Sequence, residues 1–459
     1  MRFRAFAAVA LFALSAQAAE QLGSVVFPNS GKPEAQQAFL RGVLLLHNFA
    51  YPQAAQAFLQ AEAIDPQFAL AYWGEAMTYN HPIWYETDVD AGRKALAKFS
   101  GTVTPRERAY LDAIATLYND GPLKYDAAME RLARNYLDDV EAQTFWALSI
   151  LGTRARDEVD FRKSIRAAAI LENLLASHQD HPGVLHYMIH AYDDPIHAPL
   201  GLRAARRYAT VASGAPHALH MPSHIFLQLG MWNEAARSNE AAYVLSKEWV
   251  AREKASSDKR DLHSLEWLEY IYLQQHRLDD AKRLLAEVAP QAHEAPREHH
   301  ARDMMQARYA IETGDWSVLD MFDPHPPVQF AVGLRAVQQR AYPEAQRVIG
   351  VLKAANGDIH NPNRRVAEVQ SDELLALLYT ARGEIEEGLR LAQSAIEAED
   401  ALGEPSGPPG DLKPAREVYA ELLLKAGRRD DAAEQYRSAL LRTPNRAAAL
   451  AGLAKAEAK

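Results

Sequence analysis

A residue spacing that recurs about every 34 residues constrains the fold of this chain more than any other feature. In its clearest copy, G-x11-A-x3-F-x2-A-x4-P, the residues are Gly42, Ala54, Phe58, Ala61 and Pro66. Small residues at this spacing let two helices approach closely, the aromatic ring fills the gap between them, and the proline stops the second helix. The pattern therefore predicts stacked helix pairs, each of which buries its apolar face only against its neighbours.

The last copy of the pattern is as clear as the first, with Ala432, Tyr436, Ala439 and Pro444 at the same spacing. In these residues the chain resembles the tetratricopeptide repeat (TPR) superfamily. The resemblance implies an all-α fold: a right-handed superhelical α-solenoid of about nine to eleven TPR-like helix pairs, whose first helices line the concave face.

The two ends of the chain suggest further divisions. Residues 1–19 are expected to be a secretory signal peptide, because Arg2 and Arg4 precede an apolar stretch and the small-residue cleavage site Ala16-Gln17-Ala18. We therefore expect a periplasmic or secreted protein. No later segment approaches the length of apolar residues that a membrane span needs, so no span is expected in the mature chain.

The repeat array is expected over residues 33–403, with insertions at Ser149–Phe161 and Ala251–Asp261. Residues 404–413 hold three prolines and two glycines and cannot be helical, so they are predicted to form a linker. A C-terminal TPR unit is expected over residues 414–459.

Composition removes several classes of function. Lys and Arg number 50 against 60 for Asp and Glu, a net charge of -10, and no basic run occurs, so nucleic acid and anionic membranes are not expected as partners. The chain has no cysteine, which excludes disulfides, thiolate metal sites and cysteine nucleophiles. Any chemistry must rely on His, Asp, Glu, Tyr or Ser.

The histidines are concentrated in one part of the chain: thirteen of the seventeen lie between His178 and His300. The motif L-H-x-x-x-H-x-aromatic occurs with His186 and His190, and again 34 residues later with His220 and His224. Because the interval equals one repeat, the two pairs are expected at the same place on neighbouring first helices.

Histidines at positions i and i+4 project from one face of a helix and suit Zn, Cu or another late transition metal. Two such pairs on packed helices predict four imidazoles directed towards one point. Pro222 is expected in a first helical turn, which would put His220 at the start of that helix. Duplication of a purely structural histidine pair is the rival explanation. The predicted metal ligands are His186, His190, His220 and His224, with His217, His263 and Glu266 as additional ones. The acids Asp193, Asp194 and Glu269 are further candidates as ligands or supporting acceptors.

A second group lies near the N-terminus, where His47 and His81 are also 34 residues apart and aromatic residues surround them. It predicts a ligand-binding end of the groove, although aromatic residues also pack ordinary repeats. The predicted groove residues are His47, His81, Trp73, Tyr79 and Trp84. By contrast, His178 and His181 are expected to be exposed, and no function is assigned to His276, His293, His325 or His360.

Three segments are also similar to a group of exported bacterial TPR proteins of uncharacterised function. They read A-Y-W-G-E-A-M at Ala71–Met77, T-P-R-E-R-A-Y at Thr104–Tyr110 and H-M-P-S-H-I at His220–Ile225. This resemblance covers Pro33 to about Gly230 best. It implies that the histidine segment matters, without naming its chemistry.

Three functions remain open. The first is an exported scaffold that holds a protein or peptide in its concave groove and binds no metal. The second is a scaffold of the same kind whose central histidine cluster binds a transition metal, and the third is a metalloenzyme with an open coordination position at that cluster. We favour the scaffold with a histidine cluster, and the sequence gives no support for an enzymatic activity.

Overall fold

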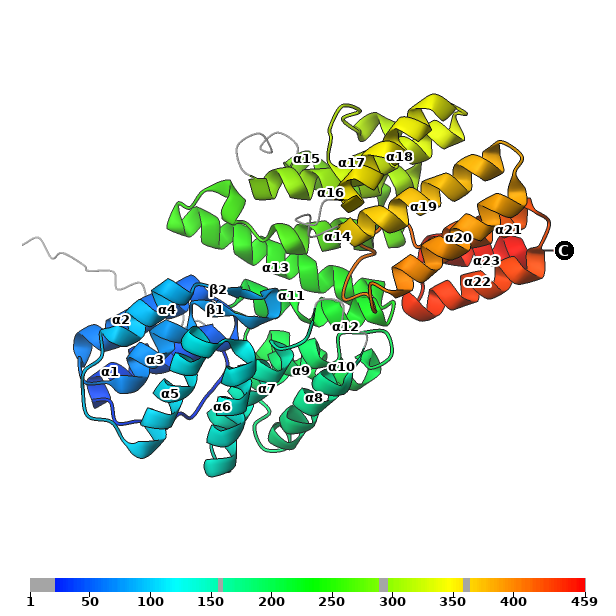
Figure 1. Ribbon diagram of the computed structural model, residues 1–459. Helices are drawn as coiled ribbons and strands as arrows, with labels where there is room; N and C mark the ends of the chain where they lie inside the picture. Colours follow the sequence, from blue (N-terminus) through cyan, green and yellow to red (C-terminus); the bar gives the residue numbers. More distant parts are fainter. Residues whose placement is uncertain (1–20, 156–159, 289–295, 358–363, 459) are drawn as a thin grey trace, which may run out of the picture.

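The computed structural model describes residues 21–155, 160–288, 296–357 and 364–458; the expected signal peptide at 1–19, His293 and His360 lie outside them. Over these residues the chain is an all-α superhelix of stacked helix hairpins, as predicted (Figure 1). None of the described helices is long and apolar enough to cross a bilayer.

The hairpins follow one another in chain order, and each packs on the next. They are α1 (Pro33–His47) with α2 (Tyr51–Ile64), α3 (Ala69–Met77) with α4 (Val89–Ala97), α5 (Pro105–Asp120) with α6 (Pro122–Asn135), α7 (Val140–Leu151) with α8 (Arg162–Leu175), α9 (Pro182–Ala191) with α10 (Ala198–Val211), α11 (Pro216–His220) and α12 (Pro222–Gln228) with α13 (Trp232–Glu253), α14 (Leu262–Gln274) with α15 (Leu278–Val288), α17 (Pro326–Gln338) with α18 (Tyr342–Gly357), α19 (Arg364–Ala381) with α20 (Ile385–Asp400), and α21 (Ala415–Lys425) with α22 (Arg429–Arg442).

Two helices stand outside this pairing. Helix α16 (Pro296–Thr313) packs between α14 and α17, and α23 (Ala447–Glu457) packs on α22 at the end of the array. A small antiparallel ladder of β1 (Asn80–His81) and β2 (Glu86–Thr87) pairs Asn80 with Thr87. The remaining elements are single 3-10 turns at Pro82–Trp84, Ser257–Lys259 and Trp316–Val318.

Local sequence explains where many helices begin. Proline occupies the first turn of α1, α5 and α9, where its missing N–H is tolerated. At the start of α5, Thr104 and Glu107 form a capping box, in which each side chain binds the backbone N–H of the other. Asp139 and Asp261 cap α7 and α14 in the simpler way, each accepting a backbone N–H.

The repeat spacing acts through close packing around Phe58. This ring is fully buried and lies against Gly42 of α1 and Gly74 of α3. A Cβ atom on Gly42 would come within 2.7 Å of the ring, and one on Gly74 would come closer still. Both positions therefore need glycine because the aromatic ring occupies the space of a side chain.

We expect Gly74→Ala to destabilise the protein by about 1–3 kcal/mol, because Phe58 has no free space into which it can move. Gly350→Ala is the control: Gly350 is a helical glycine of α18 whose added Cβ would meet no atom within 4 Å. It should gain up to about 1 kcal/mol from helix propensity. Urea denaturation of the two variants checks this, and equal stabilities would contradict it.

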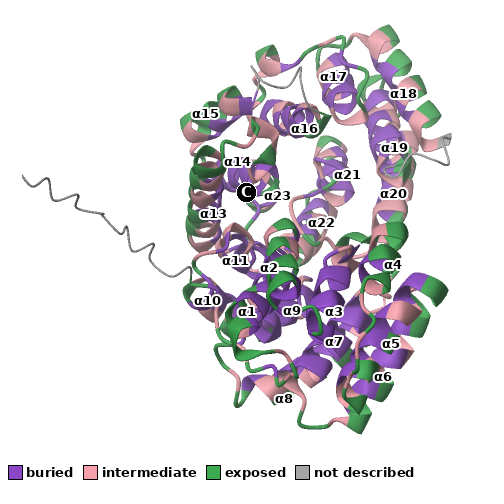
Figure 2. Cartoon of the chain, turned by 90° about the vertical axis from the view of Figure 1, so that its left-hand side faces the viewer, coloured by how far each residue is buried: buried purple, intermediate pink, exposed green. Residues whose placement is uncertain are grey.

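The superhelix closes on itself at two places. The end of α1 meets α9, where the Tyr187 hydroxyl lies 2.9 Å from His47 Nδ1. At the other end, the turn before α23 returns to the middle of the chain: Trp232 donates to the Asn445 carbonyl at 3.0 Å, and Gln274 accepts from the Ala447 N–H at 2.9 Å. Figure 2 shows α23 beside α14 as a result.

The segment predicted as a linker, residues 404–413, has no helix and lies against the solenoid. The Gln228 amide donates to the Pro405 carbonyl, and the Gln370 amide donates to the Asp411 carbonyl at 3.2 Å. Gly407 lies beside the Trp267 ring. The segment thus forms part of the wall of the central cavity described next.

Candidate metal centre

A cavity of about 2090 Å³ lies inside the superhelix. Its walls come from α1, α9, the α12–α14 region and the Pro/Gly-rich segment near residues 404–411. Its lining includes His190, His217, His224, His263, Trp84 and Trp267.

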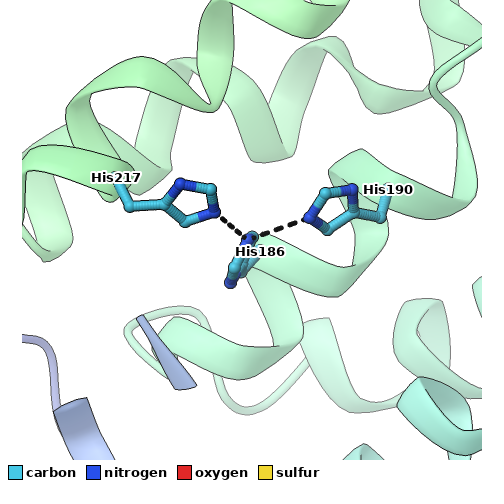
Figure 3. Close-up of side chains that lie close together, drawn as sticks. All are labelled: His186, His190 and His217. Carbon is cyan, nitrogen blue, oxygen red and sulfur yellow. Dashed lines mark hydrogen bonds between the residues drawn. The ribbon is translucent and has the colours of Figure 1, made fainter. Parts of the chain in front are cut away.

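Three histidines form a first triad at this wall (Figure 3). His186 and His190 project from α9 at the i, i+4 spacing, and His217 comes from α11. The Nε2 atom of His186 lies 3.1 Å from Nε2 of His190 and 3.1 Å from Nε2 of His217. Three imidazole nitrogens therefore converge on one small volume.

A second triad is formed by His220, His224 and His263, one potential ligand atom from each lying within 4.8 Å of the others. Nε2 of His220 and Nε2 of His224 are 3.1 Å apart. The His263 ring centroid lies 4.7 Å from that of His220, and the Trp267 ring packs against His224 at 4.4 Å.

Oxygen acceptors fix the tautomers of these rings. Nδ1 of His224 is 2.6 Å from the Asp193 carboxylate, and Nδ1 of His220 is 2.7 Å from Oδ1 of Asn239. The Asn239 amide group donates to the Ala235 carbonyl, so its oxygen is the atom that faces His220. Both Nδ1 atoms must therefore carry hydrogen, and in the neutral rings both Nε2 atoms carry lone pairs.

Two lone pairs that face each other at 3.1 Å need a cation between them. His186 is in a similar position. Its Nδ1 donates to the His47 carbonyl at 2.7 Å, so its Nε2 carries a lone pair, and this one lone pair faces Nε2 of both His190 and His217. Metal-bound histidines show this pattern, in which one ring nitrogen binds the ion and the other donates to an oxygen.

A proton is a poor candidate for that cation at most of these rings. Burial, reinforced by the neighbouring histidines, lowers the pKa of His186 and of His220 to about 3. Burial and the same kind of neighbours lower the pKa of His190 and of His217 well below the ordinary value. These imidazoles are neutral at pH 7, which is the form that binds a metal.

The predicted ligands are thus placed as two triads, not as one group of four. His217 and His263 complete the two triads, and the Asp193 carboxylate hydrogen-bonds to Nδ1 of His224. Glu266 belongs to neither triad; burial raises its pKa to about 7. The expected position of His220 at a helix start is wrong, because Pro222 begins a new helix, α12, and His220 ends α11.

The residues predicted for the N-terminal groove do not share the cavity, although the rings of His81 and Trp84 are in contact, with centroids 6.2 Å apart. Trp84 lines the cavity and has an exposed ring. His47 is fully buried, and Trp73 is only 1% exposed, packed against Phe27, Tyr110 and Phe145. His81 stacks on Tyr51, with ring centroids 4.0 Å apart, and Tyr79 packs against the core.

His47 instead belongs to a buried clamp with Glu141 and His181. The Nε2 atoms of the two histidines lie 2.8 and 3.0 Å from the two oxygens of Glu141. Their Nδ1 atoms meet the Tyr187 hydroxyl and the Val184 N–H. All donors and acceptors are used, so this group links α1, α7 and α9 and offers no free ligand atom to a metal.

The expectation that His181 is exposed is wrong, since it is only 3% exposed. It caps α9 through Nδ1, and Nε2 binds Glu141. Burial opposes the ionisation of Glu141, but His181 and His47 outweigh it and hold the pKa of that carboxyl far below its ordinary value. The sequence did not reveal this clamp because its members come from three distant helices.

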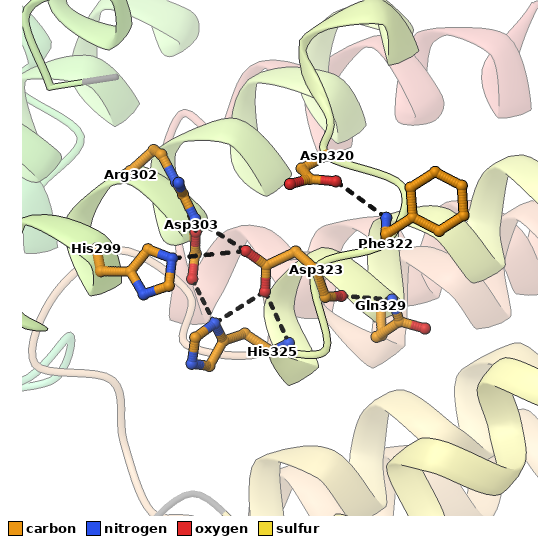
Figure 4. Close-up of polar contacts among 8 residues, drawn as sticks. All are labelled: His299, Arg302, Asp303, Asp320, Phe322, Asp323, His325 and Gln329. Carbon is orange, nitrogen blue, oxygen red and sulfur yellow. Dashed lines mark hydrogen bonds and ion pairs between the residues drawn. The ribbon is translucent and has the colours of Figure 1, made fainter. Parts of the chain in front are cut away.

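A further group near α16 contains His299, Asp303, Asp323 and His325 (Figure 4). Arg302 lies within it, 2.6 Å from Asp303 and 2.8 Å from Asp323, and His325 Nδ1 is 2.7 Å from Asp303. Sequence reasoning gave His325 no role, and the structure places it on two buried carboxylates. The guanidinium lies between the two acids and balances one of their charges, and His325 contacts both, so these contacts form an ion-pair network.

Comparison with known proteins adds little about function. No family model matches the chain, and no curated protein matches it. Among solved structures, it is similar to the APC/C hetero-tetramer Cut9-Hcn1, with 12% identity, 94% of this chain and 78% of that one covered, and a TM-score of 0.39. It is also similar to yeast Tom70, with 11% identity, 92% and 95% covered, and a TM-score of 0.36. At these values the likenesses carry no argument about function.

Proposed function

We propose that the protein is an exported TPR-type scaffold that binds a late transition metal in its central groove. The ligands are His220, His224 and His263, and Zn and Cu are the ions that an all-imidazole site suits best. The observation that carries this proposal is the separation of 3.1 Å between Nε2 of His220 and Nε2 of His224, in rings whose Nδ1 atoms both face side-chain oxygens. Export rests on the signal-like residues 1–19, which make the periplasm or the exterior the proposed location.

The cavity supports a second part of the proposal, a protein or peptide partner. A cavity of about 2090 Å³ is larger than small-molecule sites usually are, and aromatic rings such as Trp84, Trp249 and Trp267 line it. Aromatic residues are common in the parts of an interface that carry most of the binding energy. The metal site then lies on the wall of the partner's groove.

The test is metal content by mass spectrometry, measured on untagged protein purified from its export compartment. We expect near-stoichiometric Zn or Cu in the wild type and little in the His224→Ala/His263→Ala variant, which loses two ligands. His178→Ala is the matched control, because His178 lies outside both triads and hydrogen-bonds to Ser177 in a turn. It should keep the metal.

A wild type without metal that also fails to take up Zn or Cu on addition would contradict the metal site. The histidines would then serve the groove only as polar groups. Because His263 is exposed on the cavity, its replacement leaves the core intact, and circular dichroism can verify the fold of the variants.

A further inference from the structure

The two histidine triads are built in the same way. Each takes two histidines that are four residues apart, either His186 and His190 in α9 or His220 and His224 across the junction of α11 and α12. Each then takes a single histidine from the next hairpin in the chain. That single histidine, His217 of α11 or His263 of α14, is the second residue of its helix in both cases.

The likeness extends to the surroundings. The first histidine of each pair, His186 or His220, is buried and donates its Nδ1 hydrogen to an oxygen, the His47 carbonyl in one triad and Asn239 in the other. The other two histidines of each triad line the cavity. Each triad thus has one anchored ring behind and two rings at the cavity wall.

Each triad also has the dimensions of a metal site. With metal–nitrogen bonds of about 2.0–2.1 Å and near-tetrahedral angles, two bound imidazole nitrogens lie about 3.3 Å apart. The Nε2 separations of 3.1 Å in both triads fit that value. Three protein ligands leave a fourth position open, and two of the three rings of each triad line the cavity.

The triads are neighbours. The ring centroids of His190 and His224 are 5.9 Å apart, and those of His217 and His220 are 6.2 Å apart. Two ions held in these triads would therefore be adjacent and would present their open positions to the same cavity.

We propose that the six histidines form a dinuclear centre, in which His186, His190 and His217 hold a second late transition metal beside the one held by His220, His224 and His263. The ligand class for the open positions is a small oxygen donor, such as water, hydroxide or an oxyanion, that enters from the cavity. This inference rests on the proposed function, since it adds a second ion to that site.

The experiment titrates metal-free protein with Cu(II) in the presence of a competing chelator. It compares the wild type with His217→Ala, with His263→Ala and with the double variant. These two histidines are matched, because each is the second residue of its helix and lines the cavity. We expect two ions for the wild type, one for each single variant and none for the double variant, while His178→Ala binds two.

Electron paramagnetic resonance gives a second readout. In the wild type with two Cu(II), the adjacent ions should interact, seen as a half-field line or a loss of signal, whereas each single variant should give one isolated Cu(II) spectrum. Two non-interacting spectra in the wild type would overturn the dinuclear arrangement.

The stoichiometries separate this inference from the proposed function. The wild type could bind a single ion that His263→Ala removes and His217→Ala leaves in place. This result would overturn the site at His186, His190 and His217 and uphold the site at His220, His224 and His263. One ion that either variant removes would mean a single shared site. No ion in the wild type would overturn both.

Discussion

Metal-free protein should lose stability steeply as the pH falls below about 6.5. In the unfolded chain a histidine titrates near pH 6.5, whereas the folded pKa values of His186 and His220 are about 3. Those of His190 and His217 are also lowered. The contribution of these neutral rings is therefore fully present above pH 6.5 and is lost as the pH falls towards the folded values.

The size of the effect follows from proton linkage. Each such histidine lowers the free energy of unfolding by up to about 1.4 kcal/mol for every pH unit by which the pH falls, once the pH is well below 6.5. Four of them, His186, His190, His217 and His220, sum to roughly 5 kcal/mol per pH unit, against a total stability of about 5–15 kcal/mol for a typical domain. We expect the metal-free protein to unfold, at least around α9 to α14, between about pH 6 and pH 5.

Urea denaturation at pH 7.5, 6.5 and 5.5 measures this. His217→Gln should reduce the slope of the unfolding free energy against pH by up to about 1.4 kcal/mol per pH unit, because one titrating ring is removed. Protein loaded with Zn should resist acid better, since the ion binds the folded state. A midpoint that stays constant from pH 7.5 to pH 5.5 would show that these rings are not buried in neutral form.

Replacement of Arg446 should have the next largest effect. This side chain is only 1% exposed, yet it carries a full charge. Its guanidinium lies 2.6 Å from Glu417 and 2.6 Å from Glu312, and it reaches the Tyr270 hydroxyl at 3.5 Å. Arg446→Met would leave two buried carboxylates without their cation, so we expect a loss of about 3–5 kcal/mol.

Thermal unfolding of Arg446→Met checks this against Arg437→Met. Arg437 belongs to the same C-terminal unit, but its pair with Glu457 is exposed, so its loss should cost at most about 1 kcal/mol. Arg446→Met/Glu417→Gln should recover part of the lost stability, because one orphaned charge is removed with its partner. A stability for Arg446→Met within 1 kcal/mol of wild type would argue against a buried ion pair.

The repeat spacing predicted the fold because the contacts that define a helix pair are local. Gly42 and Phe58 meet within one hairpin, so their spacing alone predicts the packing. For the same reason the pairs His186/His190 and His220/His224 could be placed side by side from an interval of one repeat.

What the sequence could not predict depends on contacts between distant segments. His217 and His263 could be predicted only as additional ligands, because each comes from a following helix whose start depends on the turn before α11 or on the insertion before α14. The burial of His181 depends on α1 meeting α9, and the pairing of His325 depends on Asp303 of α16. The repeat spacing does not predict such contacts between helices that are far apart in the sequence.

The return of the chain at Asn445–Ala447 to Trp232 and Gln274 changes how the array should respond to stress. In an open array of repeats the last unit frays first, because it has a neighbour on one side only. Here the last unit has two sets of neighbours, one next to it in the chain and one about 170–215 residues earlier. Backbone amides of α22 and α23 should then exchange with deuterium at rates close to those of the central helices, as in a ring that must open before its end can unwind.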